Sequence, residues 1–350
     1  MRVLVTGATG FVGAALLSRL SAERVPCVAA GRRQGAVRFE GVTQVETGDI
    51  SAQTNWRQAL SGVDVVVHLA ARVHVMRDAA VDPLAEYRRV NVQGSLHLAR
   101  QAAAAGVKRF VFLSSIKVNG EATPAPHPPS TSSGQAEPLP GGAREKEREK
   151  EGGKFSADDV PAPQDPYGIS KMEAEAGLRE IAAQTGMEVV IIRPPLVYGP
   201  GVKANFAAMM RWLRRGVPLP LGAIHNQRSL VALDNLVDLI TVCLRHPAAA
   251  NQIFMASDGE DLSTAELIRR TARAMGVPAR LVPVPVWLLE VGAALLGRRD
   301  MAQRLCGNLQ VDISKTRQLL GWAPPVSVDE GLRRAVSGFQ TSGDEDWRGC

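Results

Sequence analysis

Cysteine is scarce in this sequence, with four widely separated residues among 350. Cys27, Cys243, Cys306 and Cys350 form neither a CxxC pair nor a cluster with histidine. This spacing argues against a disulfide framework and against a zinc site built on cysteine. We therefore expect a protein of the reducing cytoplasm that holds no metal.

Long hydrophobic runs are also lacking. The most apolar late segment, residues 286–296, is interrupted by Glu290 and is shorter than the ~20 residues that span a bilayer. The apolar residues 3–5 lie so close to the start that we expect no secretory leader. Arg298 and Arg299 follow the late segment, so an amphipathic helix lying on a membrane surface is one interpretation. An ordinary packed helix is the favoured one.

Neither sign of charge is in large excess. Lys and Arg total 41 against 35 Asp and Glu, which gives a formal net charge of +6. This mild balance does not indicate a nucleic-acid partner, and it fits a bound anion equally well. With 45% apolar residues, the chain is long enough for one large or two modest globular domains.

Short β-branched runs alternate with helical segments through the first half of the chain, a pattern typical of a parallel sheet covered on both faces. The predicted fold class is α/β, with a Rossmann doubly wound parallel sheet in residues 1–195. Proline-rich loops and helices then predict a smaller mixed α/β substrate domain in residues 196–340. The predicted strands are 2–5, 25–30, 43–46, 64–69, 109–113 and 188–193.

Residues 121–153 interrupt the alternation with proline, serine, threonine and glycine, followed by a run of mixed charges at 144–151. This composition buries too little apolar surface to order itself, so we predict a disordered surface insertion. An exposed helix over the charged run, stabilised by pairs four residues apart, is the alternative. Neither interpretation gives the segment a chemical role.

A glycine-rich turn, Thr6-Gly-Ala-Thr-Gly-Phe-Val-Gly13, follows the first predicted strand and opens a helix. Gly7 permits the tight turn, Gly10 lets the backbone approach a pyrophosphate, and Gly13 permits close packing of helix on strand. The amino end of the helix then faces the phosphates. This context predicts a dinucleotide site.

No acidic residue stands at the end of the second predicted strand, where one would hold the 2′-hydroxyl of the adenosine ribose. Arg32 and Arg33 stand there instead, and guanidinium groups present a fork of donors to a 2′-phosphate. NADP(H) is therefore predicted slightly ahead of NAD(H). The alternative is that both arginines are solvated, with Arg32 stacking on the adenine of NAD.

The ends of the third and fourth strands carry further candidate contacts. Asp49 can accept a hydrogen bond from the adenine amino group while Ile50 packs on the ring, although a simple turn aspartate is the rival interpretation. The small residues Ala70 and Ala71 allow close backbone contact with a cofactor. His68 is predicted to be a satisfied core histidine rather than a catalyst.

Tyr167 and Lys171 are spaced i,i+4, which places them on one face of a helix whose start is marked by Pro166. A neighbouring ammonium and an oxidised nicotinamide favour phenolate, so Tyr167 is a candidate general acid and base. Ser115 ends the fifth predicted strand, where its hydroxyl can bond a substrate oxygen. A helix cap or turn serine is the alternative for Ser115.

Together these motifs resemble the extended short-chain dehydrogenase/reductase family, in its NAD(P)-dependent nucleotide-sugar epimerase/dehydratase branch. The resemblance covers nearly the whole chain apart from the insertion and the last residues. It rests on the glycine-rich turn, His68-Leu-Ala-Ala71, Asn91-Val-Gln-Gly94, Ser114-Ser115, Tyr167 with Lys171, Arg193-Pro-Pro-Leu-Val-Tyr-Gly-Pro200, Asp312-Ile-Ser-Lys315 and Leu320-Gly-Trp322.

The resemblance implies that Ser115, Tyr167 and Lys171 are the catalytic triad and that Asn91 stabilises the geometry of the active-site helix. Hydride would pass between C4 of a UDP-linked hexose and the nicotinamide. Family dehydratases carry Asp-Glu directly after the catalytic Ser or Thr, whereas Ile116-Lys117 stands here, so water elimination is not expected.

Two reactions and one non-catalytic role stay open at this point. The first is 4-epimerisation of UDP-glucose or UDP-N-acetylglucosamine in bacterial surface-polysaccharide biosynthesis. The second is one-way, NADPH-dependent reduction of a UDP-4-keto-6-deoxy-hexose. The third is a sensor or scaffold that only binds NADP(H).

The resemblance also implies contacts elsewhere. Lys203, Asn205 and Arg228 match positions that contact the nucleotide diphosphate or nearby sugar, with an Asp234 ion pair as the alternative for Arg228. A helix at 233–246 would return to the first domain, and a homodimer would form through helices at 84–105 and 167–181. The full set of predicted cofactor contacts is Gly7, Thr9, Gly10, Phe11, Val12, Gly13, Arg32, Arg33, Asp49, Ile50, Leu69, Ala70, Ala71, Asn91, Ser114, Tyr167, Lys171 and Pro194.

Overall fold

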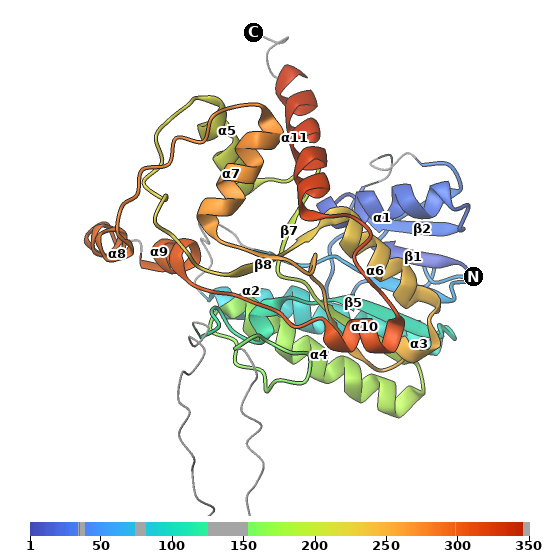
Figure 1. The fold of residues 1–350 in the computed structure, drawn as a ribbon. Coiled ribbons are helices and arrows are strands. Elements are labelled where there is room, and N and C mark those ends of the chain that lie inside the picture. The colour runs from blue at the N-terminus through green and yellow to red at the C-terminus, as the bar shows by residue number, and fades with distance from the viewer. Residues whose placement is uncertain (34, 36–38, 74–81, 125–152, 298, 346–350) are drawn as a thin grey trace, which may run out of the picture.

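A seven-stranded sheet forms the centre of the computed structural model, which describes residues 1–33, 35, 39–73, 82–124, 153–297 and 299–345 (Figure 1). Its strand order is β3-β2-β1-β4-β5-β6-β9, and each neighbouring pair is parallel. The order reverses between β1 and β4, which makes their carboxyl ends the expected ligand edge. The strands are β1 Val3–Thr6, β2 Cys27–Gly31, β3 Val42–Glu46, β4 Val65–His68, β5 Arg109–Leu113, β6 Glu188–Arg193 and β9 Ile253–Met255.

All six predicted strands are confirmed, and the predicted Rossmann fold class is confirmed with them. The sequence analysis missed β9, which contributes three residues beside β6 after a long excursion of the chain. A three-residue run is too short for its pattern to distinguish a strand from a buried loop.

Helices cover both faces of this sheet because the strands are apolar on both sides. On one face, α1 (Phe11–Ala22) and α6 (Leu233–Arg245) share a buried cluster that includes Leu17, Leu236 and Ile240. On the other face, α3 (Ser95–Ala104) and α4 (Pro166–Thr185) share a cluster that includes Leu98 and Leu178 (Figure 1). The segment predicted to return at 233–246 is α6, and it packs against α1 and β5.

A second, three-stranded sheet has the order β10-β8-β7 and comprises β7 Leu196–Tyr198, β8 Arg228–Ala232 and β10 Asp261–Leu262. The α-helices that follow β7, other than α6, are α5 Ala204–Arg214, α7 Thr264–Met275, α8 Val286–Leu295, α9 Arg299–Cys306, α10 Ser314–Leu320 and α11 Val328–Glu345. The core beside the second sheet joins Tyr198 and Leu230 to Phe206 of α5 and Leu332 of α11.

The helix that carries the candidate catalytic residues has well-defined ends. Asp165 caps the start of α4 by accepting a hydrogen bond from the Gly168 amide at 2.6 Å, and Pro166 occupies the first turn. Gly186 ends the helix in the left-handed conformation, with φ of 73°. These signals fix where α4 begins and ends, and so place Tyr167 in its first turn and Lys171 one turn later.

Two predictions are not tested by the structure. Most of the insertion predicted at 121–153 lies outside the described residues, namely 125–152. The division of the chain into two domains at residue 195 also stays a prediction. Within the described residues, none of the helices combines the length and the apolar character that crossing a bilayer requires.

Candidate active site

The glycine-rich turn after β1 packs so closely that side chains cannot be accommodated. Gly7 has φ of +68°, and a Cβ built on it would lie 2.8 Å from the backbone nitrogen of Ala70. A Cβ on Gly13 would lie 2.1 Å from the Gly7 carbonyl oxygen. Gly10 is the N-cap residue of the following helix α1 and offers no side chain to bond the first backbone amides, so these amides face the turn. This cradle fits the pyrophosphate of a dinucleotide.

The predicted cofactor contacts share one edge of the sheet. Phe11 and Val12 open α1, while Ile50 packs against Gly94, whose added Cβ would lie 2.6 Å from the Ile50 Cγ2. Since parallel strands end at the same edge, the remaining positions gather there too. Thr9 follows β1, Asp49 follows β3, Leu69, Ala70 and Ala71 follow β4, Ser114 follows β5, and Pro194 follows β6.

Arg32 and Arg33 lie exposed just beyond the end of β2. The Arg32 Nη1 is 3.9 Å from the Asp49 Oδ1, and both side chains are about four-fifths exposed, at 80% and 82%. An ion pair this long and this solvated holds its partners weakly. Both guanidinium groups are therefore accessible to an incoming phosphate.

His68 is a buried, fully hydrogen-bonded core residue, as predicted. Its Nδ1 lies 2.7 Å from the Thr6 Oγ1, and its Nε2 lies 2.8 Å from the Ser95 Oγ. Burial, aided by the charge of Lys171, lowers the pKa of His68 to about 3. The imidazole is neutral at physiological pH and has no free nitrogen for proton transfer.

The phenol of Tyr167 and the hydroxyl of Ser115 share a hydrogen bond, although they come from different elements of the chain. Ser115 starts the turn Ile116–Val118 that follows β5, and Tyr167 lies in the first turn of α4. Burial raises the pKa of Tyr167 above its usual range, and the charge of Asp165 adds to this effect. The phenol is thus protonated at neutral pH before a cofactor binds.

Lys171 lies beneath Tyr167 and is 2% exposed. Its Nζ donates a hydrogen bond to the Leu113 carbonyl at 2.8 Å and lies 4.3 Å from the centre of the Phe112 ring. The same nitrogen is 5.9 Å from the centre of the Tyr167 ring. Burial lowers the pKa of Lys171 to about 7, against the opposing effect of Glu175. The ammonium can therefore exchange its proton near neutral pH.

A buried network that the sequence analysis missed supports these side chains. Glu175, one turn beyond Lys171 on α4, receives two hydrogen bonds from Arg193, at 3.0 and 2.5 Å. The same carboxylate accepts a hydrogen bond of 2.5 Å from the Ser114 hydroxyl, and Arg193 also donates to Asn119 at 3.0 Å. The signal available in the sequence was the position of Glu175 at i+4 from Lys171.

Asn91 connects the helix before the active site to α4, as the resemblance implied. It lies in a π-helical turn, Arg88–Gly94, and its Nδ2 donates to the Ser170 Oγ and to the Arg72 carbonyl, each at 3.0 Å. Its Oδ1 accepts from the Arg72 amide at 2.8 Å. Ser170 in turn bonds the Tyr167 carbonyl at 2.8 Å, so Asn91 fixes the first turn of α4.

Lys117 occupies the place of the dehydratase carboxylates and has structural partners. Its Nζ contacts the Asp165 cap of α4 and lies 2.8 Å from the Glu121 Oε1. Ile116 is 4% exposed and belongs to the core. Neither side chain supplies a carboxyl group for water elimination, and the Lys117 ammonium is already paired with two carboxylates.

The predicted substrate contacts lie in the second half. Lys203 and Asn205 are exposed at the start of α5. The Arg228 Nη1 donates to the carbonyl oxygens of Arg304 and Gly307, at 2.9 and 3.1 Å, and burial lowers the pKa of Arg228. Asp234, considered as the ion-pair partner of Arg228, instead lies 3.1 Å from Arg334, so that alternative is wrong.

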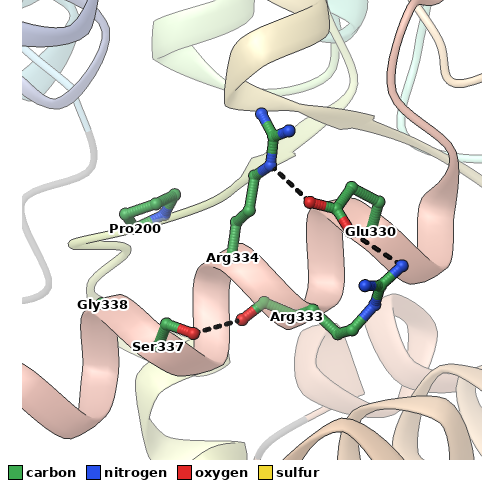
Figure 2. A pocket seen from close by; sticks show the side chains of 6 residues that line it. All are labelled: Pro200, Glu330, Arg333, Arg334, Ser337 and Gly338. Carbon is green, nitrogen blue, oxygen red and sulfur yellow. Dashed lines mark hydrogen bonds and ion pairs between the residues drawn. The ribbon is translucent and has the colours of Figure 1, made fainter.

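A separate hollow lies in the second half of the chain, between α11 and the loop after β7 (Figure 2). The Glu330 carboxylate stands between Arg333 and Arg334 at 2.7 and 2.8 Å, so both arginines are already paired. The hollow is lined by Pro200, Glu330, Arg333, Arg334, Ser337 and Gly338, and none of the predicted catalytic residues reaches it. In the described part of the chain, no group of three or more His, Cys, Asp or Glu side chains could hold a metal ion.

Comparison with known proteins agrees with this geometry. Residues 3–256 match the model of the NAD dependent epimerase/dehydratase family. A UDP-glucose 4-epimerase of Vibrio cholerae is 46% identical over 338 residues, which cover 96% of this chain and 95% of the relative. An N-acetyl-alpha-D-glucosaminyl-diphospho-ditrans,octacis-undecaprenol 4-epimerase of Escherichia coli O157:H7 is 27% identical, covering 95% and 94%.

A solved structure is also similar in fold. UDP-glucuronic acid 4-epimerase of Bacillus cereus, in complex with UDP-glucuronic acid and NAD, aligns with a TM-score of 0.73 at 21% identity. The alignment covers 98% of this chain and 100% of that one.

Proposed function

Because the chain belongs to the NAD dependent epimerase/dehydratase family, within the extended short-chain dehydrogenase/reductases, we propose that it interconverts UDP-linked hexoses that differ in configuration at C4. The observation that carries this proposal is the meeting of Ser115, Tyr167 and Lys171 beside the glycine cradle. The relative from V. cholerae, similar over nearly its whole length, supports a UDP-glucose substrate. We place the reaction in bacterial surface-polysaccharide biosynthesis.

A nicotinamide cofactor held at the glycine-rich turn of Gly7, Gly10 and Gly13 would supply the hydride acceptor and donor for the sugar C4. The residues of the chain handle the proton that leaves the C4 hydroxyl. In the oxidative half, Tyr167 in its phenolate form accepts this proton and becomes a neutral phenol, while Ser115 holds the substrate oxygen by a hydrogen bond. In the reverse half, the protonated phenol donates it back to the 4-keto oxygen.

Lys171 sets the balance between these two forms of Tyr167. A protonated amine beneath the ring stabilises phenolate, and this opposes the burial that favours the neutral phenol. The carbonyl of Leu113 and the ring of Phe112 hold the ammonium in place. Return of hydride to the opposite face of C4 requires the keto sugar to turn within the second domain.

The proposed substrate contacts come from residues of the second domain. Arg228 is the residue we propose to contact the diphosphate, because among the described residues no carboxylate lies within ion-pair distance of it. Its guanidinium is half-buried and oriented by two carbonyl oxygens, which suits a charged ligand. Lys203 and Asn205, exposed at the start of α5, would contact the nucleotide or sugar.

For the cofactor we propose NADP(H) slightly ahead of NAD(H), on the basis of Arg32 and Arg33. For assembly we propose a homodimer through the segments 84–105 and 167–181, which lie on the sheet face opposite α1. The one-way reductase and the non-catalytic scaffold are not favoured by the comparisons.

Product analysis tests the proposed reaction. Purified protein is incubated without added cofactor with UDP-glucose, UDP-N-acetylglucosamine, or the N-acetylglucosaminyl diphosphate lipid named for the E. coli relative. We expect conversion of a UDP-sugar to its C4 epimer, and no conversion by Tyr167→Phe. Turnover only with added NADPH and a 4-keto sugar would instead support the reductase.

A further inference from the structure

The helix α8 presents a continuous apolar face to solvent. Trp287, Val291 and Leu295 are spaced i, i+4 and i+8, which places them in one row, and they are 62%, 50% and 84% exposed. Leu288, beside this row, is 43% exposed. No residue of α8 is fully buried. We call Trp287, Leu288, Val291, Leu295 and the following Leu296, which is 76% exposed, the α8 face.

The segment that precedes the helix also exposes an apolar side chain. Val282 is 45% exposed, and its backbone is fixed by hydrogen bonds to Leu219 at 2.8 Å and from Gly222 at 3.0 Å. The helix itself packs on α9, and both lie at the outer end of the second domain (Figure 1). The apolar side chains are therefore carried by ordered backbone, and their exposure follows from the fold.

Basic residues accompany the apolar surface. Arg280 is exposed two residues before Val282, and Arg304 is exposed on α9, the helix that packs on α8. In the sequence, four arginines stand against two acidic residues between positions 280 and 304. An apolar helical face with a tryptophan and basic residues near it matches what lies at the interface of an anionic bilayer.

A second copy of the chain fits this surface less well. A symmetric contact between two α8 faces would bring the basic residues near this face, Arg280 and Arg304, of one copy toward those of the other. The helix has ten residues and is about 15 Å long, too small to supply the ~800 Å² that each partner of a stable dimer usually buries. Shallow burial in a lipid interface needs only one face of a short helix.

We propose that the α8 face, together with Val282, Arg280 and Arg304, docks the protein on an anionic lipid surface. The end of α9 reaches Arg228, the proposed diphosphate contact, because the carbonyl oxygens of Arg304 and Gly307 accept hydrogen bonds from it. Docking would thus hold Arg228 on the membrane side of the protein. The helix lies in the interface and does not span the bilayer.

Vesicle flotation tests the proposal on the full chain. Vesicles of phosphatidylethanolamine with 30% phosphatidylglycerol, roughly the anionic content that attracts basic segments, are compared with pure phosphatidylcholine. We expect the wild type to float with the anionic vesicles. We expect at least about tenfold less binding by Trp287→Ser/Val291→Ser/Leu295→Ser, since interfacial affinity scales with buried apolar area.

Matched variants separate the contribution of the apolar side chains to vesicle binding from that of the arginines. Val160→Ser removes another highly exposed apolar side chain, 86% exposed and outside α8, and should bind like the wild type. Arg280→Gln/Arg304→Gln should weaken binding to anionic vesicles and reduce its sensitivity to salt. If the triple variant fails to fold by circular dichroism, the single variant Leu295→Ser replaces it, with a smaller expected loss.

Two results would overturn the proposal. One is equal flotation of the wild type and the folded triple or single variant, or no flotation of the wild type with either vesicle. The other is loss of self-association by the variant in sedimentation velocity without any vesicle binding, which would make the α8 face a protein interface. Epimerisation of a water-soluble UDP-sugar by the triple variant and by Leu295→Ser should be unchanged, so docking can fail while the proposed reaction stands.

Discussion

Glu175 and Arg193 form a two-bond ion pair in which each side chain is 1% exposed. The carboxylate comes from α4 and the guanidinium from the end of β6, so the pair joins the active-site helix to the sheet. Since Glu175 also accepts a hydrogen bond from Ser114, it positions the residue before Ser115, and its charge raises the pKa of Lys171 against the larger effect of burial.

Glu175→Gln tests this connection. The variant leaves the buried guanidinium without its counter-charge, and breaking a buried pair in this way typically costs about 3–5 kcal/mol. We expect the free energy of unfolding in urea to fall by that order. Glu173→Gln is the matched control, because Glu173 lies on the same helix and pairs with Arg88 at the surface. Equal decreases in the free energy of unfolding of the two variants would contradict the role of Glu175 in joining α4 to the sheet.

The depressed pKa of Lys171 makes stability depend on pH. The folded protein releases this proton near pH 7, whereas the unfolded chain holds it up to about 10.5. Between these values the unfolded chain binds more protons, so the free energy of unfolding rises with pH, by at most about 1.4 kcal/mol per pH unit.

Lys171→Met removes this contribution. In cofactor-free protein, the difference in unfolding free energy between wild type and variant should therefore rise across pH 7 to 10.5 in favour of the wild type. Parallel stability curves for the two proteins would show that Lys171 titrates normally.

Gly13→Ala tests the cofactor cradle. Its new Cβ would lie 2.1 Å from the Gly7 carbonyl oxygen, so the turn and α1 must separate. We expect cofactor affinity, measured by calorimetry, to fall by at least about tenfold, or 1.4 kcal/mol. Gly292→Ala is the control, since a Cβ there meets no atom within 4 Å. Unchanged affinity in Gly13→Ala would place the pyrophosphate elsewhere.

The cofactor preference is tested at the end of β2. Arg32→Gln/Arg33→Gln should weaken NADPH binding by about tenfold or more, because the 2′-phosphate loses two charge-assisted donors. Binding of NADH should change little, and Arg57→Gln, also exposed, should alter neither. Equal weakening of both cofactors, measured by fluorescence titration, would support the solvated or stacking interpretation instead.

The sequence predicted six of the seven strands of the main sheet and the glycine turn, because these depend on local patterns that alternate or recur at fixed spacing. It also predicted that Tyr167 and Lys171 share a helix face, since that follows from i,i+4 spacing alone. The Glu175–Arg193 pair was missed because it depends on how α4 packs against β6. The partner of Asp234 was wrong for the same reason, since Arg334 lies 100 residues away along the chain.

Tyr167→Phe gives the most direct test of the account. The substitution removes the hydroxyl that forms a hydrogen bond with Ser115. It keeps the aromatic ring, whose centre lies 6.1 Å from the centre of the Tyr87 ring. With UDP-glucose as substrate, we expect the rate of epimerisation to fall by about 10²–10⁴-fold while cofactor and substrate still bind. A variant that interconverts the two epimers at the wild-type rate would contradict the assignment of Tyr167 as the group that moves the proton.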